Sequence, residues 1–328
     1  MRRLVTNFLN IIILLTCVMG ISQSKNRANV FVKGADIGWL PQMEATGYQF
    51  LDQDGTSKDG LQLLKDRGIN AVRLRVWVNP SNHKIDGHCS KEETVAIAVR
   101  AQKMGMRIMI NFHYSDSWAD PAKQNKPLAW ANHTVAQLKQ DVYYHTFEVL
   151  TALKTAGVTP EWVQVGNEIP GGMLWPEGST TNWSQLAQFL NSGYDAVKAV
   201  NPKIKVVVHV DEGNNNAKFR GFFDNATAQN VKYDIIGLSY YPYWIHKDYT
   251  QTIADLAANL NDMVKRYNKD VMVVEVGGEY DKVQNTYDML LAVQKKVKAV
   301  PGGKGLGGQQ HQPVQEYRGT HVPRRWLP

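Results

Sequence analysis

The chain has 328 residues, of which 43% are apolar and 20% are charged; this composition excludes a disordered chain and is enough for one large domain with a continuous core. The formal charge of +7 is spread along the sequence, without a Lys/Arg block that contains interleaved aromatic residues, so we expect no nucleic-acid partner. The nine Trp and fourteen Tyr residues are many for this length. Most should lie in the core, but rings exposed in a cleft commonly stack on sugar faces.

The first 24 residues have the pattern of a secretory signal peptide. A basic start, Met1-Arg2-Arg3, precedes an apolar run at 11–18 that is far shorter than the ~20 residues of a membrane-spanning helix. We therefore expect a secreted, periplasmic or cell-surface protein. Cys17 follows Leu-Leu-Thr, which weakly resembles a lipoprotein cleavage site, although Thr is a poor residue before such a Cys; the protein would attach to a membrane only if Cys17 were lipidated.

Removal of this signal without lipidation leaves Cys89 as the single cysteine. Cys89 then forms no internal disulfide, and the stability of the exported protein must come from packing. His83 and His88 lie close to Cys89, but their spacing matches no zinc site. We expect no metal here, and we expect a monomer.

Apolar, β-branched runs predict parallel strands, because they are too far apart to form hairpins. They lie at 30–36, 71–77, 107–113, 162–168, 205–210, 234–240 and 271–276. Segments with helical spacing separate them, at 58–67, 91–104, 134–156, 183–200, 253–267 and 286–298. Strand followed by helix indicates a parallel sheet wrapped by helices, which we interpret as an α/β TIM barrel over 25–306. A doubly wound sheet is the alternative, but no glycine-rich phosphate loop follows the first strand.

Polar and aromatic residues collect where these strands end. The set is Asp36, Arg75, Trp77, His113, Asn167, Glu168, His209, Asp211, Tyr240 and Glu275. In a barrel the carboxyl ends of the strands form the active-site face, so we interpret these residues as functional.

Two of the strands end in an acidic residue, Glu168 after Asn167 and Glu275 after a run of Val and Met. Counted along the chain, these are the fourth and seventh strands, whose ends face each other across a ring of eight. Retaining glycosidases hold two carboxyl groups about 5 to 5.5 Å apart in this way. One Glu at a strand end is more often an ion-pair partner or a helix-cap neighbour. Two on these strands favour catalysis.

The two acids need opposite protonation states, so their surroundings must differ. Hydrogen bonds from Arg75 or Arg73 and from Tyr240 would keep Glu275 charged, and nearby negative charge would keep Glu168 protonated. Strand position alone does not assign the two roles.

Five motifs resemble those of one known family: KGADIGW at 33–39, NAVRLRVW at 70–77, HYSDSWADP at 113–121, GNE at 166–168 and VEVG at 274–277. Together they are similar to glycoside hydrolase family 53, the endo-β-1,4-galactanases, from about Val30 to Leu306. The resemblance implies an eight-stranded barrel and retaining attack on the β-1,4-galactan of type I arabinogalactan and pectin. It also implies that Glu168 is the acid/base and Glu275 the nucleophile. The family would allow loop-bound calcium, but the loop at 278–281 is short, so we expect no cofactor.

The other expected site residues bind the sugar or support the acids. Asp36 and Arg75 belong to this substrate-binding set, and Asn167 is expected to bond the sugar 2-hydroxyl, with a capping role as the alternative. Tyr240 would orient the nucleophile, although Tyr241 fits the same pattern.

Trp118 and Trp244 are expected to stack on sugar rings, because each follows a strand among polar neighbours. For His113 and His209, catalytic support and a satisfied buried histidine stay equal alternatives.

The C-terminal segment departs from the family pattern. An eighth strand with an aromatic run ending in Trp, followed by a last helix, is expected there, but 307–328 has neither alternation nor an apolar run. Our hypothesis is an altered, irregular tail, as a shifted reading frame would produce, with the last strand and helix missing. A seven-stranded barrel would then be open and expose an unpaired edge.

Two other functions remain open from the sequence. A mannanase or xylanase could use the same two acids on the same barrel, because loops choose the sugar. An inactive, sugar-binding barrel is the second alternative, because of the tail.

Overall fold

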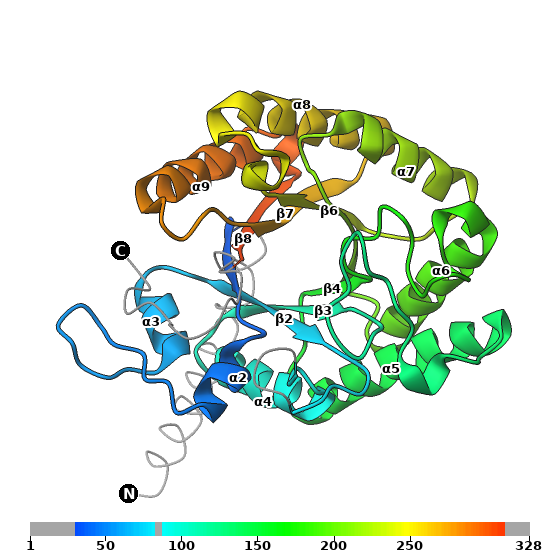
Figure 1. The fold of residues 1–328 in the computed structure, drawn as a ribbon, viewed down its shortest axis with the longest axis horizontal. Helices are drawn as coiled ribbons and strands as arrows, with labels where there is room; N and C mark the ends of the chain where they lie inside the picture. Colours follow the sequence, from blue (N-terminus) through cyan, green and yellow to red (C-terminus); the bar gives the residue numbers. More distant parts are fainter. Residues whose placement is uncertain (1–29, 83–86, 312–328) are drawn as a thin grey trace, which may run out of the picture. The chain divides into compact units, whose positions relative to one another are not determined.

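The computed structural model describes residues 30–82 and 87–311. From Val32 onward the chain forms a closed barrel of eight parallel strands that follow one another in chain order (Figure 1). The strands are β1 (Val32–Asp36), β2 (Ala71–Val76), β3 (Arg107–Phe112), β4 (Trp162–Val165), β5 (Lys205–Val210), β6 (Ile235–Tyr240), β7 (Asp270–Val276) and β8 (Gly305–Gln310). The seven expected strands are confirmed, with ends that differ by at most a few residues. The expected signal peptide and Cys17 lie outside the described residues.

Helices surround the ring of strands (Figure 1). They are α2 (Leu40–Ala45), α3 (Gly60–Asp66), α4 (Lys91–Lys103), α5 (Val135–Thr155), α6 (Trp183–Val200), α7 (Asn216–Ala228), α8 (Tyr249–Tyr267) and α9 (Val283–Lys298). The six expected helices are confirmed, and α2 and α7 are additional. Helix α7 was missed because Asn and Gly interrupt its pattern, yet Phe219, Phe222 and Phe223 bury one face of it.

Local signals explain where the helices begin and end. Ser90 opens α4 with a capping box to Glu93, which satisfies two backbone donors at once. Gly68, Gly105 and Gly157 follow α3, α4 and α5 with φ of 83°, 77° and 78°, the left-handed conformation in which a helix ends at glycine. In the part of the chain that the structure describes, no helix is long and apolar enough to cross a membrane.

The expected open, seven-stranded barrel is wrong. Strand β8 pairs on one side with β1, where Val32 lies opposite Gly307, and on the other side with β7, where Val271 lies opposite Gly305. The barrel therefore continues to Gln310, past the expected boundary at Leu306. The expected absence of a last helix falls on 312–328, outside the described residues.

Close backbone approach explains why β8 has no strand-like sequence. A Cβ on Gly307 would lie 2.3 Å from the Val32 carbonyl oxygen, and Gly307 has φ +144°, a conformation open to glycine but rarely to other residues. A Cβ on Gly305 would lie 1.9 Å from the Val297 carbonyl oxygen. Close approach to β1 at Gly307 and to helix α9 at Gly305 thus requires glycines, which remove the usual β-strand pattern.

The core of the barrel below the carboxyl ends of the strands is apolar. Eight buried residues form one cluster, against which Leu306 of β8 packs: Val32, Ala71, Met109, Trp162, Val207, Ile235, Met272 and Val274. Burial of this cluster stabilises the ring and leaves the polar side chains at the carboxyl ends of the strands.

Candidate active site

Glu168 follows β4 on an unusual stretch of backbone. Gly166 and Glu168 have φ of 83° and 44°, both in the left-handed region, which costs a non-glycine residue roughly 1–3 kcal/mol. The side-chain amide of Gln124 stabilises the turn by donating to the carbonyl oxygens of Asn167 at 2.8 Å and Glu168 at 3.0 Å. The chain therefore leaves the strand abruptly, and the Glu168 side chain is delivered to the barrel mouth.

Glu275 lies near the end of β7 and is 6% exposed. Its Oε1 is 2.7 Å from Nη2 of Arg73, and its Oε2 accepts a hydrogen bond from the Tyr241 hydroxyl at 2.9 Å. Burial by itself would raise the pKa of Glu275. The positive charge of Arg73, followed by the interactions with His311 and His209 and by the Tyr241 hydrogen bond, outweighs burial and lowers this pKa to about 2. Glu275 is therefore ionised at neutral pH.

Glu168 has the opposite surroundings. Its Oε1 accepts a hydrogen bond from the Ser239 hydroxyl at 2.5 Å, and no described ion pair joins its carboxyl group to a cation. Burial, followed by the negative charge of Glu275, raises the pKa of Glu168 well above its ordinary value, although the Ser239 bond opposes the shift. The raised pKa fits a group that holds a proton, and its main cause is burial, to which the expected negative charge adds.

Arg73 joins the two strand ends. Its Nη2 donates to Asn167 Oδ1 at 2.8 Å as well as contacting Glu275, and its Nη1 contacts Asp36 Oδ2 at 2.6 Å. Sequence reasoning left Arg73 and Arg75 as alternatives for the partner of Glu275, and the structure selects Arg73.

Arg75 and Asp36 are both buried at the carboxyl ends of β2 and β1. The nearest Arg75 contact with Asp36 is 3.5 Å, and its guanidinium stacks on Trp118 at 3.9 Å from the ring centroid. Asp36 is 2% exposed, and His311 and Arg73 outweigh burial to lower its pKa. In this structure Asp36 therefore positions Arg73, and its expected contact with the sugar stays a prediction.

The two buried histidines are satisfied by neighbouring groups. His113 Nδ1 accepts from the Ala119 backbone N–H at 3.0 Å, and its Nε2 lies 3.0 Å from Asn111 Nδ2. His209 is fully buried and contacts Gln164 and Ser239. Burial, followed by the positive charge of Arg75, holds the pKa of His113 well below its ordinary value, and burial is also the main reason that the pKa of His209 falls to about 3.

The expected role of Tyr240 is wrong. The Tyr240 hydroxyl contacts Thr252 Oγ1 at 2.8 Å on the helix layer, whereas Tyr241 donates to Glu275. Side chains alternate along a strand, so Ser239 and Tyr241 share the inner side and Tyr240 points outward. The pairing of β6 with β7 also shifts register between Leu238 and Ser239, which the sequence does not reveal.

The two expected stacking tryptophans differ in exposure. Trp118 is half-buried and lies edge-on to His113 at 5.8 Å between ring centroids. Trp244 is 57% exposed on a short 3-10 helix, Pro242–Ile245, and its ring centroid lies 4.9 Å from that of Tyr243. Sugar stacking by Trp118 and Trp244 stays a prediction.

His311 is a site residue that the interpretation of an irregular tail missed. Its backbone N–H donates to Val276 O at 2.8 Å, which continues the pairing beyond β8. Its ring centroid is 6.2 Å from that of Trp118 and 6.3 Å from that of Tyr241, and its Nε2 is 3.9 Å from Asp36 Oδ2. Only the closed barrel brings His311 to this position.

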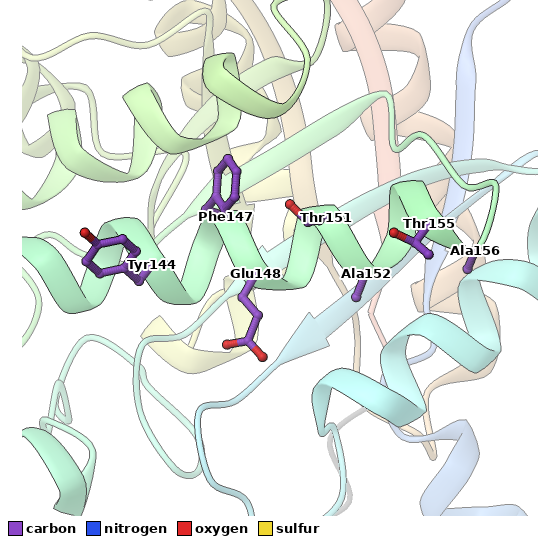
Figure 2. Close-up of a pocket in the computed structure, with 7 residues that line it drawn as sticks. All are labelled: Tyr144, Phe147, Glu148, Thr151, Ala152, Thr155 and Ala156. Atoms are coloured by element: carbon purple, nitrogen blue, oxygen red, sulfur yellow. The ribbon is translucent and has the colours of Figure 1, made fainter.

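Figure 2 shows a separate groove, lined by residues on and just after α5 and by none of the groups above. One face of the helix lines it, from Tyr144 to Ala156, and its single acid, Glu148, is ion-paired with Lys91. The groove thus lacks the paired acids found at the mouth. Among the described residues, no group of three or more His, Cys, Asp or Glu side chains could hold a metal ion. The expected absence of a cofactor stays a prediction.

Comparisons with known proteins agree with this geometry. The arabinogalactan endo-β-1,4-galactanase of Thermothelomyces thermophilus is 34% identical over 249 residues, which cover 74% of this chain and 73% of that protein. The protein in the bgaB 5′ region of Niallia circulans is 35% identical over 336 residues, with 92% and 89% covered. A structure from work on two fungal β-1,4-galactanases has 30% identity and a TM-score of 0.78, covering 87% of this chain and 90% of that chain. The model of glycosyl hydrolase family 53 matches residues 32–313, so this chain belongs to that family.

Proposed function

We propose that this protein is a retaining endo-β-1,4-galactanase that cuts the galactan side chains of type I arabinogalactan and pectin. The observation that carries the proposal is the opposite tuning of two acids at one barrel mouth, with the pKa of Glu275 lowered and that of Glu168 raised. The galactanases among its relatives indicate that the substrate is β-1,4-galactan.

The reaction runs in two displacements at one carbon. In the first, Glu275 attacks the anomeric carbon while Glu168 gives its proton to the departing glycosidic oxygen, which leaves a glycosyl-enzyme and a shortened chain. In the second, Glu168 takes a proton from water, the water oxygen attacks the same carbon, and the bond to Glu275 breaks. Two inversions give net retention.

The groups around Glu275 match both steps. Arg73 and Tyr241 hold the carboxylate ionised before attack and stabilise it again when it leaves. Asn167 donates from Nδ2 to Ala119 O at 2.8 Å, and we propose that its second N–H donates to the sugar 2-hydroxyl.

Reducing-end release separates galactan from other substrates. We expect the protein to cleave purified β-1,4-galactan, and proton NMR of the first product should show the β-anomer. Inertness on galactan with cleavage of mannan or xylan would reject the sugar assignment. The alternative of an inactive barrel depended on the absence of an eighth strand. Because β8 is present and pairs with β1, that reason no longer holds.

We also propose that the chain is exported, acts as a monomer and needs no metal. The basic start and short apolar run within residues 1–24 support export. N-terminal sequencing of the mature protein tests signal removal, and Cys17→Ala tests lipidation. Unchanged hydrolysis after chelation by EDTA is the expected result for a metal-free site.

A further inference from the structure

A chain of hydrogen bonds with a defined direction runs from Arg73 to Glu168. A guanidinium can only donate, and Arg73 donates to Gln164 Oε1 at 3.1 and 3.3 Å. The other end of the Gln164 amide is therefore its NH₂ group, which lies 3.0 Å from His209 Nδ1 and also donates to Asn111 Oδ1 at 2.7 Å. The positions of the oxygen and nitrogen in the Gln164 side-chain amide are therefore fixed by Arg73, which needs an acceptor.

His209 accepts hydrogen bonds on one ring nitrogen and donates from the other, so the chain of donors keeps its direction. Its Nδ1 faces two donors, the Gln164 NH₂ group and the Glu168 backbone N–H at 3.3 Å, and neither can accept a hydrogen, so this nitrogen carries no proton. Burial keeps the imidazole neutral, with a pKa of about 3. A neutral ring must then carry its hydrogen on Nε2, which donates to Ser239 Oγ at 2.7 Å.

Ser239 is the last donor in this chain of hydrogen bonds, and Glu168 is its acceptor. The Ser239 oxygen accepts from His209, and the described acceptor for its own hydrogen is Glu168 Oε1, 2.5 Å away. Oε1 therefore acts as an acceptor. In a protonated Glu168 the hydrogen is left on Oε2, the other oxygen of the carboxyl group.

We infer that Ser239, oriented by His209, is a positioning residue that keeps the acid proton of Glu168 on Oε2 and so presents it to the glycosidic oxygen. Ser239 is 1% exposed and acts through Glu168. The inference rests on the proposed function and adds to it the oxygen that carries the proton.

The leaving group provides the test, because a good leaving group needs no proton. We would measure kcat/KM of Ser239→Ala on galactan and on a 2,4-dinitrophenyl β-1,4-galactobioside, since kcat/KM reports the step in which the leaving group departs. We expect a loss of about ten- to hundredfold on galactan, part of the roughly 10²- to 10⁴-fold that a positioned acid contributes. The activated substrate should lose far less.

A pH profile supplies a second readout. The Ser239 hydrogen bond lowers the pKa of Glu168, so its removal raises this pKa, and the alkaline limb of kcat/KM on galactan should move to higher pH. Ser239→Thr keeps the hydroxyl and should restore both the rate and the limb. If the alanine variant does not fold, Ser239→Cys fills the site with a weaker donor and should show the same leaving-group contrast.

Tyr240→Phe is the matched control, because it removes the neighbouring hydroxyl on the same strand, which contacts Thr252 and not Glu168. It should lower both rates equally or not at all. Equal losses of Ser239→Ala on both substrates, or none on galactan, would overturn the inference.

Glu168→Ala separates failure of the inference from failure of the proposed function. It should lose galactan hydrolysis yet keep most of its kcat/KM on the activated substrate. If Glu168→Ala loses both equally, Glu168 is not the acid, and the proposed function falls with the inference.

Discussion

Glu275 and Glu168 occupy similar positions at the ends of strands, but the side chains that contact their carboxyl groups are different. Both side chains end a buried strand at one barrel mouth, but Glu275 contacts a guanidinium and a phenol, whereas Glu168 contacts a serine that is bonded to a neutral histidine. One pKa falls to about 2 and the other rises. The comparison shows that neighbours from other strands, and not the residue type, set the two pKa values on which the proposed roles of nucleophile and acid depend.

The largest effect should come from removing the ionised member of the pair. Glu275→Gln removes the attacking oxygen, and we expect kcat on galactan to fall roughly 10⁴-fold or more, as loss of a covalent nucleophile does elsewhere. Unlike Glu168→Ala, this variant should also lose the activated galactobioside. Initial rates on both substrates measure the contrast, and substantial turnover of either by Glu275→Gln would contradict the assignment.

Arg73→Lys should have the next largest effect. Lysine keeps the charge but cannot reach Glu275, Asp36 and Gln164 together, so kcat/KM should fall roughly ten- to hundredfold, the value of one or two charged hydrogen bonds. Arg73 lowers the pKa of Glu275, so the weaker contact raises it. The acidic limb of the pH–rate profile, which reports ionisation of Glu275, should then move to higher pH.

Arg75→Lys is the matched control, because Arg75 stacks on Trp118 and makes no ion pair with Glu275 among the described contacts. Its acidic limb should move less. An equal shift in the two variants would remove the special role of Arg73.

Tyr241→Phe should lower kcat by about tenfold, because it deletes one hydrogen bond to a charged carboxylate. Tyr240→Phe deletes a bond to Thr252 instead, so it should leave kcat near wild type and lower the free energy of unfolding by about 0.5–1.5 kcal/mol. Kinetics and urea unfolding of the two variants test this exchange of roles. A larger kinetic loss in Tyr240→Phe would reverse our correction.

Trp244→Ala should have the smallest effect. The ring is more than half exposed and has no described contact with either acid, so it can affect binding without affecting chemistry. We expect KM on galactan to rise about two- to tenfold, from a stacking energy of roughly 0.5–1.5 kcal/mol, with kcat unchanged. A fall in kcat with constant KM would place Trp244 in the chemistry and not in a binding subsite.

The sequence by itself determined the strands β1 to β7, most of the helices and the two acids. Each of these depends on a local pattern: an apolar run, helical spacing, a glycine cap, or an acid where a buried strand stops. Glu168 and Glu275 were found because charge at the end of a hydrophobic run is costly unless it is used or paired.

Only the tertiary structure decided the rest. Strand β8 exists because ring closure supplies backbone partners on both sides of a glycine-rich segment, and His311 reaches the mouth as a result. The choices of Arg73 over Arg75 and of Tyr241 over Tyr240 depend on strand register and on which face a side chain occupies, and a shift of one residue reverses that face. Ser239 became visible only through its partners, because the direction of a hydrogen bond is a property of three-dimensional neighbours.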